Sequence, residues 1–288
     1  MTDFQVESQV VTPPVISAPR RLYWCVQREL WESRSIYLAP LFVAAVFLFG
    51  FLISEFARPH EIEKSFDFVA AAIMATTFVV AIFYCLDALN SERRDRSILF
   101  WKSLPVSDLT TVLSKASIPL VVLPLLTFAI TIITQSIMLL IRTAVLLSGG
   151  LSVTALWSHL PLFDMSLGLL YHLLAIHSLF YAPIFGWLLL VSAWARRAAF
   201  LWAALPLFAI GVVEKISFNT SHFAGMLMNR IGGGAQAAPA TASGMSMNLM
   251  PAGGPGQFLV SPGLWIGLAV AAAFLGAAVR LRRKREPI

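Results

Sequence analysis

The sequence predicts an all-α integral membrane protein with six transmembrane helices, an N-terminal interfacial elbow helix and both termini in the cytoplasm. Of its 288 residues, 58% are hydrophobic and 12% are charged, and the mean hydropathy is +0.78. Soluble domains carry roughly 25% charged residues, so this composition is typical of a chain in lipid. The apolar runs are continuous rather than alternating, which favours helices over the strands of a membrane barrel.

Six segments are apolar over much of the roughly 20 residues that a helix needs to cross a bilayer core of about 30 Å. They are Leu38–Ile53, Phe68–Leu86, Ile118–Ile141, Leu169–Ala195, Ala198–Val213 and Gly263–Val279. Their interiors contain no Asp, Glu or Lys. Carriers driven by protons or sodium usually need ionisable groups within the membrane. If this protein moves a substrate, we therefore expect the energy to come from outside the bilayer.

Basic residues gather on one side of the six segments. On that side lie Arg20, Arg21, Arg28, Arg34, Arg93, Arg94, Arg96, Lys102, Lys115, Arg196, Arg197, Arg280, Arg282, Arg283, Lys284 and Arg285. The opposite loops hold Arg58, Lys64, Arg142, Lys215 and Arg230. About three-quarters of the positive charge is on one side, which the positive-inside rule places in the cytoplasm. Because these clusters flank apolar runs, the net charge of +6 indicates membrane lipids as partners and not nucleic acid.

The chain is expected to begin with a disordered cytoplasmic tail, residues 1–19, followed by a single membrane domain, residues 20–288. The tail has no basic start, and Pro13, Pro14 and Pro19 interrupt it, so it is not typical of a signal peptide. We expect insertion through the first transmembrane helix without cleavage.

The segment Arg20–Ser35 is too charged to cross the membrane and predicts an amphipathic helix that lies in the cytoplasmic interface. One face carries the apolar residues Leu22, Tyr23, Val26, Leu30 and Trp31. Arg28 and Glu32 are spaced to pair on another face. The alternative interpretation is a plain cytoplasmic extension of the first transmembrane helix.

Enzyme signatures are absent from the sequence. It has no Gly-rich phosphate loop with a following Lys, no H-E-x-x-H and no G-x-S-x-G. Cys25 and Cys85 have no disulfide or metal-ligand spacing and are expected to be reduced thiols. We therefore predict a protein that is not an enzyme and binds no cofactor itself. An intramembrane enzyme is disfavoured because the six segments hold no polar catalytic set.

Three further patterns have a structural and a functional interpretation. His172 and His177 lie five residues apart, about 140° around an α-helix, so they are expected to hydrogen-bond separately and not to share a ligand. The outer loop, 214–262, carries His222 and the methionines Met226, Met228, Met245, Met247 and Met250. These are possible Cu(I) ligands, although flexible linkers also collect methionine. The small residues Gly263, Gly267 and Ala271 allow close helix packing, either within the bundle or between copies.

The loop 88–115 is the largest feature on the predicted cytoplasmic side. It opens with the charged residues Glu92, Arg93 and Arg96, which we expect at an exposed rim. A short apolar helix follows with Ile98, Leu99, Phe100, Trp101 and Leu104, and Pro105 ends it. Ser107 or Asp108 can cap the next helix. The apolar helix either lies against the headgroups or docks on a cytoplasmic partner, with its aromatic residues as anchors.

This loop resembles the cytoplasmic loop of bacterial type 2 ABC-transporter permeases. The resemblance is carried by Glu92-Arg93, Ser97-Ile98-Leu99, Leu104-Pro105-Val106-Ser107 and Lys115. In that family an E-R-x-x-[GS]-[TI]-[LI] turn leads to a P-[VL]-S step and a Lys before the third helix. The elbow helix and the six spans are also similar, from about Arg20 onward. Ser97-Ile98 replaces the more usual Gly-Thr, and the Gly- and Met-rich outer loop leaves open whether paired outer re-entrant helices are present.

The resemblance implies the permease subunit of an ATP-driven ABC transporter, an exporter, in the bacterial cytoplasmic (inner) membrane. Residues 92–107 would dock on a separate cytoplasmic ATPase subunit, which binds the ATP and Mg. A second permease copy or a paralogue would complete a homo- or heterodimer. An apolar or amphipathic substrate, such as a lipid, peptide or drug, is favoured. The competing hypothesis is a non-transporting membrane anchor or sensor that recruits a cytoplasmic regulatory protein through the same loop.

Overall fold

The computed structural model describes residues 17–57, 62–95, 107–150, 162–231 and 259–284, and within these ranges it is helical, without strands. The elements are α1 (Ala18–Glu32), α2 (Ser35–Ala57), α3 (Ile62–Asp87), α4 (Asn90–Arg94), α6 (Asp108–Ser117), η1 (Ile118–Val122), α7 (Leu123–Ser148), α9 (Leu162–His172), η2 (Leu173–Phe180), α10 (Ala182–Trp194), α11 (Ala199–Phe218), α12 (His222–Ile231) and α14 (Pro262–Lys284). In this part of the chain, six helices are long and apolar enough to cross a membrane. The prediction of an all-helical, multi-pass membrane protein is confirmed.

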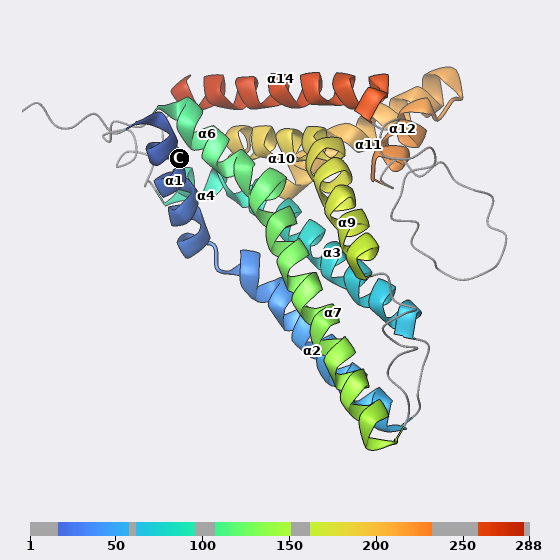
Figure 1. Cartoon of the computed structure of the whole chain (residues 1–288). Helices are drawn as coiled ribbons and strands as arrows, with labels where there is room; N and C mark the ends of the chain where they lie inside the picture. Colours follow the sequence, from blue (N-terminus) through green and yellow to red (C-terminus); the bar gives the residue numbers. More distant parts are fainter. Residues whose placement is uncertain (1–16, 58–61, 96–106, 151–161, 232–258, 285–288) are drawn as a thin grey trace, which may run out of the picture.

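The long helices α2, α3 and α7 pack side by side and form one half of the molecule (Figure 1). Phe51, Phe66, Ile73 and Met138 are buried where they meet. The third predicted span belongs to a continuous helical segment, Asp108–Ser148, that contains the π turn η1. Pro119 and Pro124 lack a backbone N–H, so they interrupt the regular α-helical hydrogen bonds around this turn.

The fourth predicted span, Leu169–Ala195, is bent and not a single straight helix. It consists of α9, the π-helix η2 and α10, and α9 and α10 point in different directions (Figure 1). At the bend, the Tyr181 N–H donates to the Ile176 carbonyl at 3.0 Å, five residues back. Pro183 follows in the first turn of α10, where its missing N–H is tolerated. The sequence shows the proline but not the extra residue that makes the turn wider.

The last helix, α14, packs along α10. Gly186 of α10 permits this approach, because a Cβ at Gly186 would lie 3.2 Å from the Ala271 carbonyl oxygen. At Gly267 the space is occupied by the Arg230 side chain, whose Nη2 lies 1.8 Å from where a Cβ would be. Gly267 and Ala271 therefore pack within the chain, as one of the two interpretations predicted, whereas Gly263 is exposed and a Cβ there would meet nothing.

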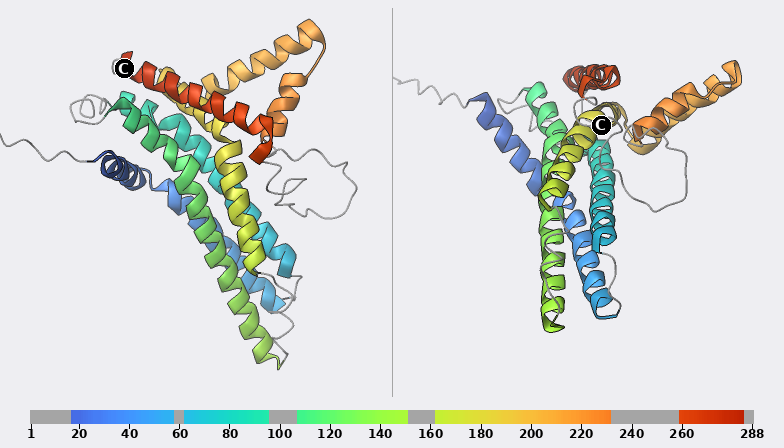
Figure 2. Two further views of the ribbon diagram at one scale, coloured as in Figure 1. Left: turned by 45° about the horizontal axis from the view of Figure 1, so that its top comes forward. Right: turned by 45° about the vertical axis from the view of Figure 1, so that its right-hand side comes forward.

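Helix α11 projects away from the other helices, and α12 folds back toward the start of α14 (Figure 2). The predicted outer loop, 214–262, thus begins inside α11, which continues to Phe218. Asn219 reverses the chain with a φ of 52°. The Glu214 carboxylate then caps α12 by accepting the N–H groups of His222 at 2.7 Å and Phe223 at 2.9 Å.

Helix α1 confirms the predicted helix at Arg20–Ser35, but its apolar residues do not share one environment. Val26 and Leu30 pack against the core, whereas Tyr23 and Trp31 are exposed. The predicted pair of Arg28 and Glu32 forms, with Nε and Oε2 separated by 3.4 Å. Leu22 is half-buried. The inward face of α1 therefore carries charged as well as apolar side chains.

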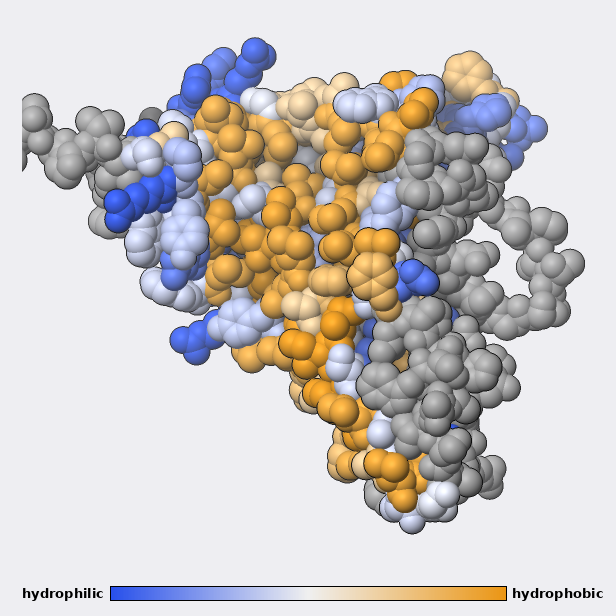
Figure 3. All heavy atoms as spheres, viewed as in Figure 1, coloured by the Kyte–Doolittle hydropathy of each residue, from blue (hydrophilic) through white to orange (hydrophobic). Residues whose placement is uncertain are grey.

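The surface is apolar over the middle of the molecule, including α7 and α9 (Figure 3). Hydrophilic residues gather where α1 and the C-terminal end of α14 lie. We call this end, where α1, α4, the start of α6 and the end of α14 meet, the basic end. At the opposite end, Glu55 of α2 and Arg142 of α7 form an ion pair with a buried carboxylate.

Candidate functional site

The candidate site is a buried network of charged side chains at the basic end. It includes Glu92 of α4 and Lys115 of α6, which flank residues 96–106 in the sequence. Helices α1 and α14 complete it. The site therefore lies at the base of the segment that the sequence singles out as a docking loop.

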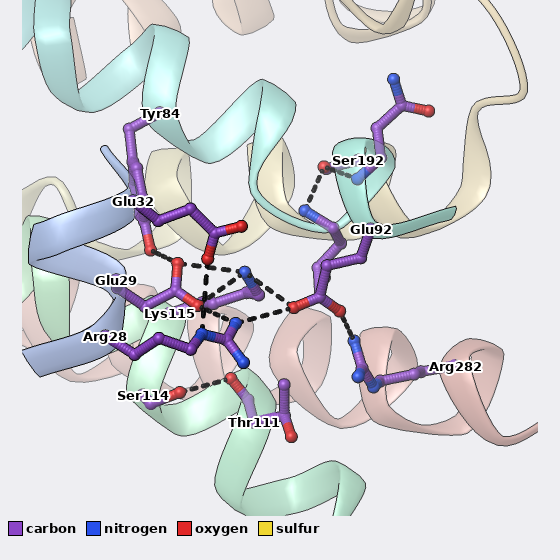
Figure 4. A network of polar contacts seen from close by, with 12 residues as sticks. Arg28, Glu29, Glu32, Tyr84, Glu92, Thr111, Ser114, Lys115, Ser192 and Arg282 are labelled. Atoms are coloured by element: carbon purple, nitrogen blue, oxygen red, sulfur yellow. Dashed lines mark hydrogen bonds and ion pairs between the residues drawn. The ribbon is translucent and has the colours of Figure 1, made fainter. Parts of the chain in front are cut away.

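Lys115 is the centre of the network (Figure 4). Its Nζ lies 2.9 and 3.1 Å from the two carboxylate oxygens of Glu29 and 3.1 Å from Oε1 of Glu92. The three side chains are only 3–4% exposed. One ammonium group thus joins carboxylates from two elements that are 63 residues apart in the chain.

Two arginines balance the remaining negative charge. Arg28 Nη2 lies 2.7 Å from Glu29 and 3.2 Å from Glu92. Arg282 Nη1 pairs with Glu92 Oε2, and its Nε lies 3.0 Å from Asp108. These contacts match three basic groups with the carboxylates of Glu29, Glu92 and Asp108, and the fourth carboxylate, Glu32 beside Arg28, is 61% exposed. Such a balance is required because an unpaired charge in a water-poor site is strongly destabilising.

A neutral contact extends the network into the bundle. The Tyr84 hydroxyl of α3 donates to Glu29 Oε2 at 2.9 Å. Cys85, the next residue, is fully buried, and Cys25 of α1 is partly buried. Burial raises the pKa of the Cys25 thiol, so it stays protonated and weakly reactive at neutral pH. For Arg28, burial opposes the charge, but Glu29 and Glu92 outweigh it and raise the guanidinium pKa.

A second set of contacts fixes α4 to the end of α10. Arg93 Nη1 donates to the carbonyls of Ala193 at 2.9 Å and Ala195 at 3.3 Å. These carbonyls lie at a helix C-terminus, where the helix dipole favours a cation. The Ser192 hydroxyl oxygen accepts the N–H groups of Leu89 and Asn90, both at 3.0 Å. The chain is therefore held immediately before the loop.

A groove of about 550 Å³ lies beside the network, between α1, α3 and α4. Glu32, Asp87 and Asp95 line it together with the buried Glu29 and Glu92. Arg94 and Lys115 also reach the groove, so its walls are net acidic. Apolar residues of α3 continue the groove toward the bundle surface, including the exposed Phe83.

The expected exposed rim is wrong for two of its three residues. Glu92 and Arg93 are 4% and 5% exposed, because they serve the internal network and the end of α10. Arg96, Ile98, Leu99, Phe100, Trp101, Leu104 and Pro105 lie outside the described residues. The Ser107 cap is confirmed, since its hydroxyl accepts the Thr110 N–H at 3.1 Å.

Sequence reasoning missed the pairing of Lys115 with Glu29 and Glu92. It counted Lys115 and Arg282 among the charges that set the topology, expected Glu92 at an exposed rim and assigned no role to Glu29. One sequence signal could have indicated buried ion pairs. In α1, α4, α6 and α14, a charged residue stands directly beside an apolar run. Within the described ranges, no group of three or more His, Cys, Asp or Glu residues is arranged to hold a metal ion.

Comparisons with protein-family models, curated proteins and solved structures found no match to the chain. The site must therefore be interpreted from its own geometry and chemistry.

Replacing Lys115 with Met should destabilise the protein by about 3–5 kcal/mol, because Glu29 and Glu92 would remain buried around an apolar side chain. Arg94→Met is the matched control, since the Arg94–Asp95 pair is more than 60% exposed on both sides. An exposed pair contributes less than about 1 kcal/mol. Unfolding of the purified protein in one detergent, followed by tryptophan fluorescence, compares the two variants. Equal losses would show that Lys115 does not hold the network together.

Proposed function

We propose that this protein is the permease subunit of an ATP-driven ABC transporter, an exporter that is coupled to a separate ATPase through residues 92–107. The observation that carries the proposal is the charge network, which holds the chain in place both before and after the loop. Glu92 lies before the loop and Lys115 after it, and both are bound to Glu29 or Arg28 of α1. Arg282 of α14 also pairs with the Glu92 carboxylate.

A loop that receives mechanical work needs a rigid base, because flexible ends would absorb the displacement. Here the base combines buried ion pairs with the Arg93 and Ser192 contacts to α10. Interfaces and packed cores respond to displacement as units and not by continuous deformation. A push on the loop would therefore move α6 and the continuous α7 together with α1 and α14. This arrangement supports a coupling role for the loop.

An external energy source is consistent with the distribution of charge. The sequence has no phosphate loop, so ATP and Mg would bind to the partner subunit. The charged residues of the described spans lie near the span ends, and they include the basic-end network and the Glu55–Arg142 pair. Within the network and the Glu55–Arg142 pair, each carboxylate lies beside a cation. These pairs act as structural clamps, and none provides a chain of ionisable groups across the bundle.

The exposed apolar surface of α11 supports assembly with a second permease copy or a paralogue. Large side chains such as Phe208, Ile216 and Phe218 are 74–79% exposed. Among the six candidate spans of the described chain, α11 is the least buried. Lipid covers whatever part of this surface the second subunit leaves free. The amphipathic α1, with Trp24 and Trp31 exposed, would lie in the membrane interface as an elbow helix.

The proposed orientation places the basic end and both termini in the cytoplasm of a bacterial cell, and the protein in its inner membrane. In a chain without native cysteines, His60→Cys and Ala240→Cys should react with an impermeant maleimide in sealed cells. Asp95→Cys and Lys284→Cys should react only after permeabilisation. Labelling of Asp95→Cys in sealed cells would reverse the orientation and remove the proposed access of an ATPase to the loop.

The docking role predicts different effects for two residues of the loop. Trp101→Ala should release the ATPase, since truncation of a buried aromatic anchor costs about 2 kcal/mol or more, which weakens binding more than tenfold. Arg96→Ala should leave the complex assembled, because an exposed charge contributes about 1 kcal/mol or less. Both variants are purified from cells that also produce the tagged ATPase, and bound ATPase and ATP-dependent transport are measured.

Assembly and transport that survive Trp101→Ala would contradict docking through the loop. A captured partner without ATPase activity, lost in the Trp101 variant, would instead support the anchor or sensor hypothesis. For the transport measurement, vesicles are screened with lipids, peptides and amphipathic drugs, because the described spans keep their charges near the two ends.

A further inference from the structure

The bent fourth span brings two histidines together that sequence reasoning separated. In an α-helix, residues five apart point about 140° away from each other. His172 ends α9, and His177 lies within η2, where the turn is π-helical and closes over five residues instead of four. The two imidazole rings are consequently near each other, with centroids 6.0 Å apart and planes at 50°. The expectation that the two side chains point to different sides of the helix is therefore wrong.

His177 is buried, and neither of its ring nitrogens makes a hydrogen bond of good geometry. The residue is 9% exposed, and the Met74 carbonyl lies near the ring. Its other neighbours are the rings of Tyr181 at 5.4 Å and Phe78 at 6.1 Å. A buried polar group left unsatisfied costs about 1–3 kcal/mol. This cost, at a π-helical turn of the kind often found at functional sites, points to a missing ligand.

The distance between the rings fits a shared metal ion. An imidazole nitrogen binds a metal ion such as zinc at about 2.0–2.1 Å. The centroid of the same ring then lies about 3.2 Å from the metal. Two ligating rings then have centroids about 5.2 Å apart at a tetrahedral angle and about 6.4 Å apart in a linear arrangement. The observed 6.0 Å lies between these limits, nearer the linear one. His172 is half-buried, so the side of the histidine pair formed by His172 is accessible to a metal ion.

The composition of the site selects among metals. No third His, Cys, Asp or Glu joins the pair in the described part of the chain, so an ion that needs four protein ligands is poorly served. A single charge is also less costly than a double charge among apolar rings. Cu(I) meets both conditions, and it accepts imidazole and thioether ligands.

The neighbouring helix α12 carries exposed thioethers, a ligand type that Cu(I) accepts. Tyr181, which contacts His177, donates its hydroxyl to the Ile231 carbonyl at the end of α12 at 2.9 Å. The same helix exposes the thioethers of Met226 and Met228, at 65% and 70%. The sequence analysis grouped these methionines with His222 as possible Cu(I) ligands and did not connect them with His172 or His177.

We propose that His172 and His177 form a Cu(I)-binding site at the bend of the fourth span. The site is separate from the charge network, and the proposal does not depend on transport or on an ATPase.

Titration of the purified, tag-free, full-length chain with Cu(I) under anaerobic conditions, in competition with bicinchoninate, tests the site. A Cys25→Ser background removes the accessible thiol, and Cys85 is fully buried. We expect one bound Cu(I), with its affinity lowered at least about tenfold in His172→Ala and in His177→Gln. His60→Ala is the control, since it removes an imidazole that is not among the candidate Cu(I) ligands and should leave the affinity unchanged.

X-ray absorption of the bound copper provides a second readout and should show nitrogen ligands that are lost in His172→Ala. His172 is half-buried, so this variant is decisive even if His177→Gln impairs folding. Equal Cu(I) affinity in the parent chain and His172→Ala would overturn the proposal, as would copper ligated only by sulfur. A site that binds Zn(II) through both histidines but not Cu(I) would overturn the choice of metal.

Discussion

The organisation of the basic end depends on the ammonium group of Lys115, which lies between two buried carboxylates. A buried carboxylate is strongly destabilising unless a cation lies beside it. Lys115 contacts both at 2.9–3.1 Å, and Arg28 and Arg282 supply the rest of the positive charge. Because the partners come from four different helices, the requirement for charge balance fixes the relative position of those helices.

This constraint explains features that are otherwise unrelated. α1 has an inward face with charged residues because that face completes the network, and its exposed aromatic residues are free for another surface. The C-terminal end of α14 reaches back to α4 and to Asp108 through Arg282. Arg93 turns inward to the carbonyls at the end of α10. A loop between such fixed points can pass on a displacement, which connects the network with the proposed coupling role.

The sequence predicted well what depends on local composition. The apolar runs marked all six membrane-crossing regions, and the periodic pattern marked α1, because burial of long apolar segments leaves few structural choices. The pairing of Lys115 with residues 86 and 23 positions away could not be predicted, because it depends on how the helices pack. The π-helical turn at His177 was missed for a related reason: a single sequence gives no signal for one extra residue within a turn.

A double-mutant cycle between Glu29 and Lys115 tests the central claim most directly. The free energy of unfolding is measured in one detergent for the parent chain, Glu29→Gln, Lys115→Met and the double variant. Each single change leaves an unbalanced buried charge, whereas the double change removes one charge of each sign. The account predicts that the double variant loses less stability than the sum of the single losses, with a coupling energy of at least about 1 kcal/mol. Strictly additive losses would contradict it and would show that the two side chains do not depend on each other.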